Sequence, residues 1–160
     1  MKASKLLTLI MVIVLTCTAL VSCGSSDLDT GVFSVSAPSG WEIMKRRVDG
    51  AEKDDQVYVI KGEADNTSYP HILICYYKDP SQYKDEKSFY KDAKDVSAIE
   101  AGDRKWEGYT YSLFGSAEAC LTAKEGDALW VCKFVLEKSG EKIAVDDKEV
   151  KEILSSLKVK

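Results

Sequence analysis

Residues 128–136 read Ala128-Leu129-Trp130-Val131-Cys132-Lys133-Phe134-Val135-Leu136, the most hydrophobic segment of the chain after residue 22. Its apolar side chains stand at odd and even positions alike, which in a strand places them on both faces of a sheet. Residues 56–61 and 71–78 repeat this pattern. Strands that are apolar on both faces are covered on both faces. We therefore predict that residues 128–136 form the central strand of a sheet lying between two other layers.

The segments on either side of these strands predict hairpins. The turns Gly102-Asp103 and Glu125-Gly126-Asp127 each join two extended segments directly, and the charged residues 46–55 predict a loop. Direct hairpins argue against a parallel βαβ fold, so we predict a mainly antiparallel sheet. The further predicted strands are 32–38, 41–44, 96–101, 104–114 and 119–124.

Two segments predict helices. Residues 80–95 follow a cap formed by Asp79 and Pro80 and place Phe89 and Ala93 on one face. The second predicted helix is C-terminal. Its predicted cap is Asp146 with Glu149, and its apolar stripe is Val150, Ile153, Leu154 and Leu157. With helices on both faces of the sheet, the predicted class is α+β and the predicted architecture is an α/β/α sandwich.

The first 22 residues have the parts of a secretory signal. Two lysines precede an apolar run from Leu6 to Val21, which is shorter than the roughly 20 residues of a membrane-spanning helix. The run ends in Leu20-Val21-Ser22-Cys23, which resembles the lipobox of bacterial lipoproteins. That resemblance implies cleavage before Cys23 and a diacylglycerol on its sulfur. We expect residues 1–22 to be the signal peptide and the mature chain to be extracytoplasmic, anchored to a bacterial cell membrane.

Residues 23–30 predict a lipidated tether, because they are small and polar and lack periodicity. From Gly24 to Thr30 such a tether reaches at most about 25 Å. The rest, residues 31–160, is long enough for one domain with a core of its own.

The charge balance argues against a role in nucleic-acid binding. The formal net charge is −4, and loss of the two lysines in residues 1–22 brings it to −6. Nucleic-acid binding requires basic patches, and an acidic surface does not adhere to anionic lipid by charge. We expect attachment to membrane lipid through acyl chains on Cys23, since two chains anchor a protein stably.

A second resemblance covers residues 31–160. The run Phe33-Ser34-Val35-Ser36-Ala37-Pro38-Ser39-Gly40-Trp41 is similar to the opening of PsbP-like domains, and Ile153 to Leu157 is similar to the end of their C-terminal helix. The family includes a photosystem II subunit, a Ran-binding import factor and many bacterial lipoproteins. The resemblance implies an α/β/α sandwich with a binding or adaptor role. In physical terms, Pro38 and Gly40 reverse the chain so that the large ring of Trp41 packs on the sheet.

Three cysteines remain once Cys17 leaves with the signal and Cys23 carries lipid. A three-residue turn at 125–127 would set Cys120 opposite Cys132, within the range of a disulfide. The hypothesis of a cross-strand bridge stands beside the alternative of two buried thiols that pack as small apolar side chains.

The remaining candidate residues predict no catalytic centre. His71 is the only histidine of the sequence, and no nucleophile motif accompanies it. The aspartates lack the order of a calcium loop and the cysteines lack metal-ligand spacing, so we predict no metal and no cofactor. The aromatic residues either line a ligand groove or pack in the core. The aromatic residues that could line such a groove are Tyr76, Tyr77, Tyr83, Tyr90, Trp106, Tyr109 and Tyr111, and the candidate groove residues among them are Tyr76, Trp106, Tyr109 and Tyr111.

The expected function is that of a non-catalytic binding or adaptor module for an envelope protein or a small ligand. The alternative is a hydrolase that acts on cell-envelope material, and a third possibility is a structural envelope component. A deep polar pocket that gathers two carboxylates, or a thiol beside His71, would favour the enzyme, whereas a shallow apolar patch with tyrosines would favour binding.

Overall fold

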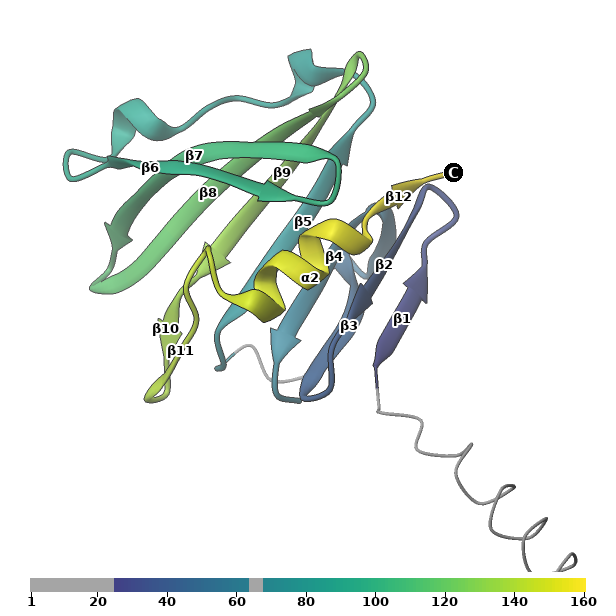
Figure 1. Ribbon diagram of the computed structural model, residues 1–160, viewed down its shortest axis with the longest axis horizontal. Coiled ribbons are helices and arrows are strands. Elements are labelled where there is room, and N and C mark those ends of the chain that lie inside the picture. Colours follow the sequence, from purple (N-terminus) through teal and green to yellow (C-terminus); the bar gives the residue numbers. More distant parts are fainter. Residues whose placement is uncertain (1–24, 64–67) are drawn as a thin grey trace, which may run out of the picture.

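A computed structural model describes residues 25–63 and 68–160. Its main feature is a seven-stranded sheet in the order β3-β4-β5-β9-β8-β7-β6 (Figure 1), in which every neighbouring pair is antiparallel. The strands are β3 (Trp41–Val48), β4 (Ala51–Lys61), β5 (His71–Tyr77), β6 (Lys94–Ala101), β7 (Arg104–Leu113), β8 (Ser116–Glu125) and β9 (Ala128–Val135).

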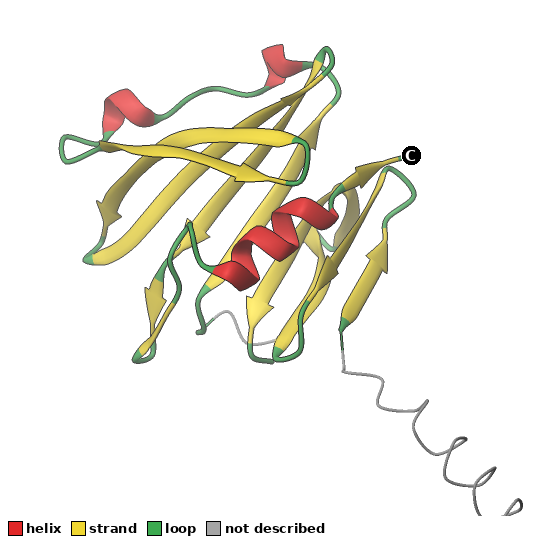
Figure 2. Cartoon of the chain, viewed as in Figure 1, coloured by secondary structure: helices red, strands yellow, loops and turns green. Residues whose placement is uncertain are grey.

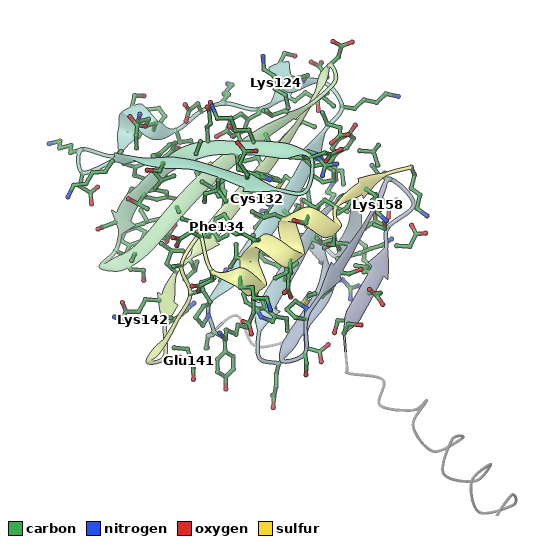
Figure 3. All side chains as sticks on the ribbon, in the orientation of Figure 1. Lys124, Cys132, Phe134, Glu141, Lys142 and Lys158 are labelled. Atoms are coloured by element: carbon green, nitrogen blue, oxygen red, sulfur yellow. The ribbon has the colours of Figure 1, made fainter. Side chains whose placement is uncertain are left out.

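The central position of β9 is confirmed, since three strands lie on each side of it. Its side chains alternate between two separate clusters. Trp130 and Cys132 belong to the larger cluster, on what we call the inner face of the sheet, and Cys132 is labelled in Figure 3. Val131 and Leu129 belong to the smaller cluster on the opposite side, the outer face. The apolar residues at odd and even positions of β9 are therefore buried on opposite faces of the sheet, as the sequence indicates.

The inner face is covered by regular elements from both ends of the chain (Figure 1). They are β1 (Ser26–Asp29), β2 (Phe33–Ala37) and β12 (Lys158–Val159), which form a three-stranded sheet, and the helix α2 (Lys148–Ser156). Phe33 of β2 meets Trp130 edge to face at 5.0 Å between ring centroids. A short hairpin of β10 (Glu137–Lys138) and β11 (Glu141–Lys142) leads into α2.

The C-terminal helix is confirmed. Val150, Ile153 and Leu154 are buried against the sheet, as their spacing predicts. The N-cap is Asp147 rather than Asp146, and its Oδ2 accepts a hydrogen bond from the backbone N–H of Ala144.

The predicted helix at 80–95 is wrong. Residues 79–93 instead form an irregular segment, the strap, which crosses the outer face with two 3₁₀ turns, η1 (Pro80–Gln82) and η2 (Lys87–Phe89) (Figure 2). Asp79 does cap a turn, since its Oδ1 accepts from the N–H of Ser81. The apolar stripe is too weak to hold a helix: Phe89 is 79% exposed, and the tyrosines of the strap pack on the sheet in its place.

The α+β class and the α/β/α sandwich are therefore wrong as well. Across residues 25–63 and 68–160 the chain is mostly β, and α2 is the one α-helix. The helical layer that the PsbP-like resemblance implies on the outer face is replaced by the strap. The inner layer combines a single helix with three strands.

Two segments predicted as irregular are strands. The loop at 46–55 is a hairpin of β3 and β4, turned by Asp49 and Gly50 at φ of 51° and 82°. Within the predicted tether at 23–30, residues Ser26–Asp29 form the strand β1, which pairs with β2. The signal peptide at 1–22 and Cys23 lie outside the described residues.

Candidate functional site

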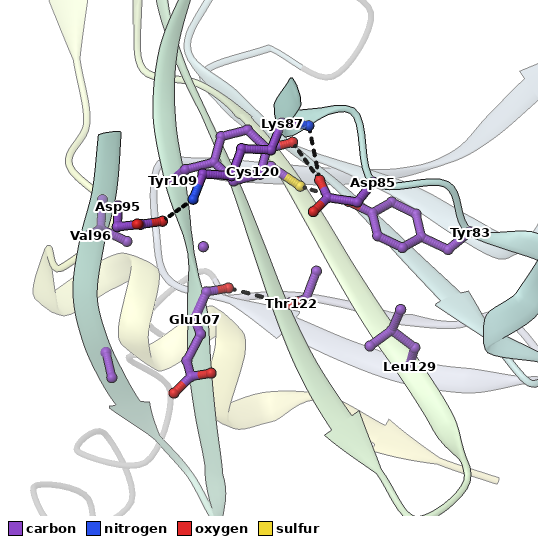
Figure 4. Close-up of a pocket in the computed structure, with 12 residues that line it drawn as sticks. Tyr83, Asp85, Lys87, Asp95, Val96, Glu107, Tyr109, Cys120, Thr122 and Leu129 are labelled. Carbon is purple, nitrogen blue, oxygen red and sulfur yellow. Dashed lines mark hydrogen bonds and ion pairs between the residues drawn. The ribbon is translucent and has the colours of Figure 1, made fainter. Parts of the chain in front are cut away.

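The candidate site is a pocket of about 420 Å³ between the strap and the outer face of β6 to β9, which we call the outer pocket (Figure 4). The strap forms one wall and the sheet forms the floor. Three carboxylates, one ammonium, two phenols and one thiol line it, together with small and apolar side chains. The lining residues are Tyr83, Asp85, Lys87, Asp95, Val96, Ala98, Glu107, Gly108, Tyr109, Cys120, Thr122 and Leu129.

Tyrosines hold the strap on the sheet. The ring of Tyr90 stacks on the ring of Tyr111 at 3.9 Å between centroids, and the ring of Tyr83 tilts against that of Tyr77 at 5.7 Å. An ion pair between Glu86 and Lys133 of β9, with 2.9 Å between Oε2 and Nζ, adds a third attachment. Because these contacts are side-chain contacts to separate strands, the strap needs no regular backbone structure.

A hydrogen-bond network fixes the strap wall. The Oδ1 atom of Asp85 accepts from the hydroxyl of Tyr109 at 3.1 Å and from the backbone N–H of Lys87 at 3.0 Å. The Nζ atom of Lys87 lies 2.5 Å from Oδ1 of Asp95 and 5.9 Å from the ring centroid of Tyr109 (Figure 4). The pocket thus already holds one ammonium group over an aromatic ring.

Gly108 allows the pocket floor to pack closely. A Cβ atom at this position would lie 1.9 Å from the carbonyl oxygen of Cys120 on β8. The neighbouring strand therefore excludes every larger residue at this point.

The phenols and the thiol of the pocket are uncharged at neutral pH. Burial raises the pKa of Tyr83 and of Tyr109 well above the ordinary value of a phenol, with a further contribution from Cys120. Burial also raises the pKa of the Cys120 thiol, whose sulfur lies 3.4 Å from the hydroxyl of Tyr83. A nucleophilic cysteine requires the thiolate, so Cys120 is suited to packing rather than to attack.

The charged groups give the pocket a negative balance. The lining holds the carboxylates of Asp85, Asp95 and Glu107 and the single cation of Lys87, a formal charge of −2. Glu107 also pairs with Lys105 outside the lining, at 2.6 Å between Oε1 and Nζ. Carboxylates and neutral phenols together form a site for a donor-rich or cationic ligand.

The structure does not bring the four predicted groove residues together. Tyr109 lines the outer pocket, and Tyr111 lies beside it under Tyr90. Tyr76 and Trp106 lie on the inner face, where Tyr76 contacts Trp130 at 4.7 Å between ring centroids. The four residues come from two strands of one sheet, β5 and β7, and their side chains are divided between its two faces, which the type of side chain alone does not reveal.

The hypothesis of a Cys120–Cys132 disulfide is wrong because the register differs by one residue. Glu125 pairs with Ala128 across a two-residue turn, so Cys120 faces Lys133 and Cys132 faces Leu121. A shift of one residue turns side chains to the other face. Cys120 therefore belongs to the outer cluster and Cys132 to the inner core, and both are free thiols, as is Cys75.

His71 takes no part in the outer pocket. Its Nδ1 lies 2.9 Å from the carbonyl oxygen of Tyr69, its ring meets that of Tyr58, and burial lowers the pKa of the imidazole. Burial raises the pKa of Cys75, on the same strand, to about 11. Within residues 25–63 and 68–160, no three acidic, histidine or cysteine side chains are grouped so as to hold a metal ion.

Tyr83 of the strap wall is among the aromatic residues that could line a groove, but no residue of this wall is among the four candidate groove residues. Tyr83, Asp85 and Lys87 fall in the segment predicted as a helix, in which the aspartates and lysines predict a solvated face. The available signal was Tyr83 and Tyr90, two large side chains seven residues apart in a segment with few other apolar residues.

The comparisons with known proteins bear on the fold alone. No family model matches the sequence, and no curated protein matches it. The structure is similar to a chain in a 1.50 Å crystal structure from Bacteroides thetaiotaomicron VPI-5482, with a TM-score of 0.50 and 16% sequence identity. The match covers 86% of this chain and 49% of that chain, so the present chain spans about half of its length.

The described part of the chain contains no helix long and apolar enough to cross a bilayer.

Proposed function

We propose that this chain is a lipid-anchored extracytoplasmic binding module that takes a small ligand in the outer pocket. The observation that carries the proposal is the lining of that pocket. It combines hydrogen-bond donors, carboxylates and an aromatic ring, while its one thiol has a raised pKa. Binding sites commonly join a concave surface to a few well-placed polar groups.

The support for a lipid anchor comes from the sequence, because Cys23 resembles the lipidated cysteine of bacterial lipoproteins. Only Gly24 and Ser25 separate it from the first residue of β1. Three residue steps reach about 10 Å. A lipid on Cys23 would therefore hold the folded domain against the membrane surface rather than at the end of a free tether.

Replacement of the anchoring sulfur tests the localisation. In cells fed radiolabelled fatty acid, we expect the parent to carry label and to sediment with membranes. We expect Cys23→Ala to lose the label and to leave the membrane fraction. Retention of Cys23→Ala in the membrane as firmly as the parent would contradict the anchor.

A pocket-filling substitution tests the binding. Ala98 is exposed and lines the outer pocket, whereas Ala117 is exposed on β8 and does not line it. In an NMR screen of small fragments, we expect hits on the parent to shift the amides of Tyr109 and Leu129. Ala98→Phe should lose these shifts and Ala117→Phe should keep them. If both variants lose the amide shifts, or both keep them, the fragments do not bind specifically in the outer pocket.

Hydrolysis of envelope material is the second candidate, and one observation favours it. Three residues that carry carboxylates line the same pocket, and paired carboxyl groups serve as general acid and base in hydrolysis. Incubation of the protein with purified peptidoglycan decides between the two functions. Product release that Glu107→Gln or Asp85→Asn abolishes would support the enzyme, and no release above a buffer control would support binding.

A further inference from the structure

We propose that the outer pocket binds a primary alkylammonium group, held over the ring of Tyr109 and against Asp95 and Asp85, in place of the ammonium of Lys87. This inference rests on the proposed binding function and specifies the chemistry of its ligand.

The first argument is that the chain itself supplies a cation to this position. The Nζ atom of Lys87 lies 2.5 Å from Oδ1 of Asp95 and 5.9 Å from the ring centroid of Tyr109. The side chain of lysine beyond Cα is a butylammonium group, so the pocket already displays its ligand chemistry. An external ammonium that makes the same contacts needs no new arrangement of the acceptor groups.

The second argument is that Lys87 is able to leave. Its side chain is 39% exposed, its partner Asp95 is 76% exposed, and η2 has no buried residue. Exposed ion pairs contribute little because water screens them and side-chain entropy opposes them. Since the backbone N–H of Lys87 stays bound to Asp85, the strap keeps its place when the side chain swings out.

The third argument concerns charge and shape. With Lys87 turned away, Asp85 and Asp95 remain as carboxylates of the lining without a lysine partner, while Glu107 stays paired with Lys105. A primary ammonium offers three N–H donors to such acceptors. Val96 and Leu129 supply apolar walls for the alkyl part, and Tyr109 supplies the ring face.

The test uses the full chain in a maltoside detergent, with n-butylammonium as the probe and 1-butanol as its uncharged control. Binding is followed by ¹⁵N NMR titration. We expect butylammonium to shift the amides of Tyr109 and Leu129 and 1-butanol to leave them in place. Lys87→Met removes the competing ammonium and keeps the stem, so its affinity for butylammonium should rise about two- to fivefold. Asp95→Asn should weaken binding about two- to fivefold.

The ring is tested with a matched pair of variants. Tyr109→Phe keeps the aromatic face and should retain binding, whereas Tyr109→Leu should lose it. Because Tyr109→Leu removes a ring from the outer cluster, its folding is checked by thermal unfolding, and Lys87→Met gives the decisive result if it fails to fold.

The outcomes separate this inference from the proposed function. Unchanged or weaker affinity of Lys87→Met, or binding of 1-butanol equal to that of butylammonium, would overturn the ammonium assignment. Shifts of the pocket amides by uncharged fragments alone would do the same and would leave the binding function in place. If neither the two probes nor any screened fragment shifts these amides, both proposals fail.

Discussion

The two faces of the central sheet are built from different chemistry. The inner face is an apolar core with three tryptophans, Trp41, Trp106 and Trp130, and is covered by paired strands and α2. The outer face carries tyrosines, two thiols and Lys133, and is covered by an irregular strap. The strands of the inner cover pair with one another and pack on the central sheet by burying apolar side chains, whereas the strap is held mainly by separate side-chain contacts. The comparison indicates that the inner face stabilises the fold and leaves the outer face free to carry a site.

The largest expected difference between the faces concerns two adjacent residues of β9. Trp130→Ala empties the inner core, removes the ring that meets Phe33 and leaves Glu125 without the indole N–H it accepts from. We expect a loss of about 4 kcal/mol in the free energy of unfolding. Leu129→Ala on the outer face is half-buried and should lose about 1 kcal/mol. Urea unfolding followed by circular dichroism measures both free energies. Equal losses in the two variants would contradict the difference between the faces.

The thiols give a closer comparison, because the same substitution is made on each face. Cys132→Ser places a hydroxyl in a fully buried apolar site, and we expect a loss of about 2 kcal/mol. Cys120→Ser keeps a partner in the hydroxyl of Tyr83 and should lose less than about 1 kcal/mol. A larger loss for Cys120→Ser, measured by the same urea unfolding, would contradict the division between faces.

The strap should open without unfolding the core. Tyr90→Ala removes the stacked contact with Tyr111, which contributes about 1 kcal/mol. Hydrogen–deuterium exchange should then become faster over the strap and stay unchanged over α2. Tyr58→Ala serves as a control, since Tyr58 lies on β4 away from the strap and should leave strap exchange unaltered. Faster exchange throughout the chain after Tyr90→Ala would mean that strap and core unfold together.

The smallest expected effect is a pH dependence that comes from His71. Its pKa is lowered by burial, so the unfolded chain takes up a proton at a higher pH than the folded chain does. The free energy of unfolding should therefore fall as the pH drops below about 6.5 and level off once the folded imidazole is also protonated. His71→Gln should flatten this part of the profile measured by thermal unfolding between pH 7 and 5. If stability depends on pH equally in parent and variant, the pH dependence comes from groups other than His71.

The sequence predicts the inner half of the molecule better than the outer half. Residues 128–136 and α2 are identified by hydrophobic pattern, because burial there is extensive and periodic. The strap defeats the same reasoning. Asp79 and Pro80 are typical of a helix start. The segment nevertheless has too few apolar residues for packing to offset the conformational entropy that is lost when a helix forms, and Tyr83 and Tyr90 pack on the sheet as separate side chains.

The candidate site was predicted only in part, through Tyr109. A strand residue is assigned to one face or the other by register, and the register at residues 125–128 depends on whether the turn has two residues or three. That single ambiguity separates Cys120 from Cys132 and decides which side chains meet the strap. The lining from the strap becomes visible only when its path over β6 to β9 is known.

The most direct test of the account measures stability and binding together in two variants, one from each side of the molecule. Ile153→Val trims the fully buried inner face of α2, and Asp95→Asn alters the exposed rim of the outer pocket. We predict that Ile153→Val lowers the free energy of unfolding by about 1 kcal/mol and leaves butylammonium affinity unchanged. Asp95→Asn should lower that affinity about two- to fivefold and change stability by less than about 0.5 kcal/mol. Two variants that each change both quantities, or an Asp95→Asn protein that binds as well as the parent, would contradict it.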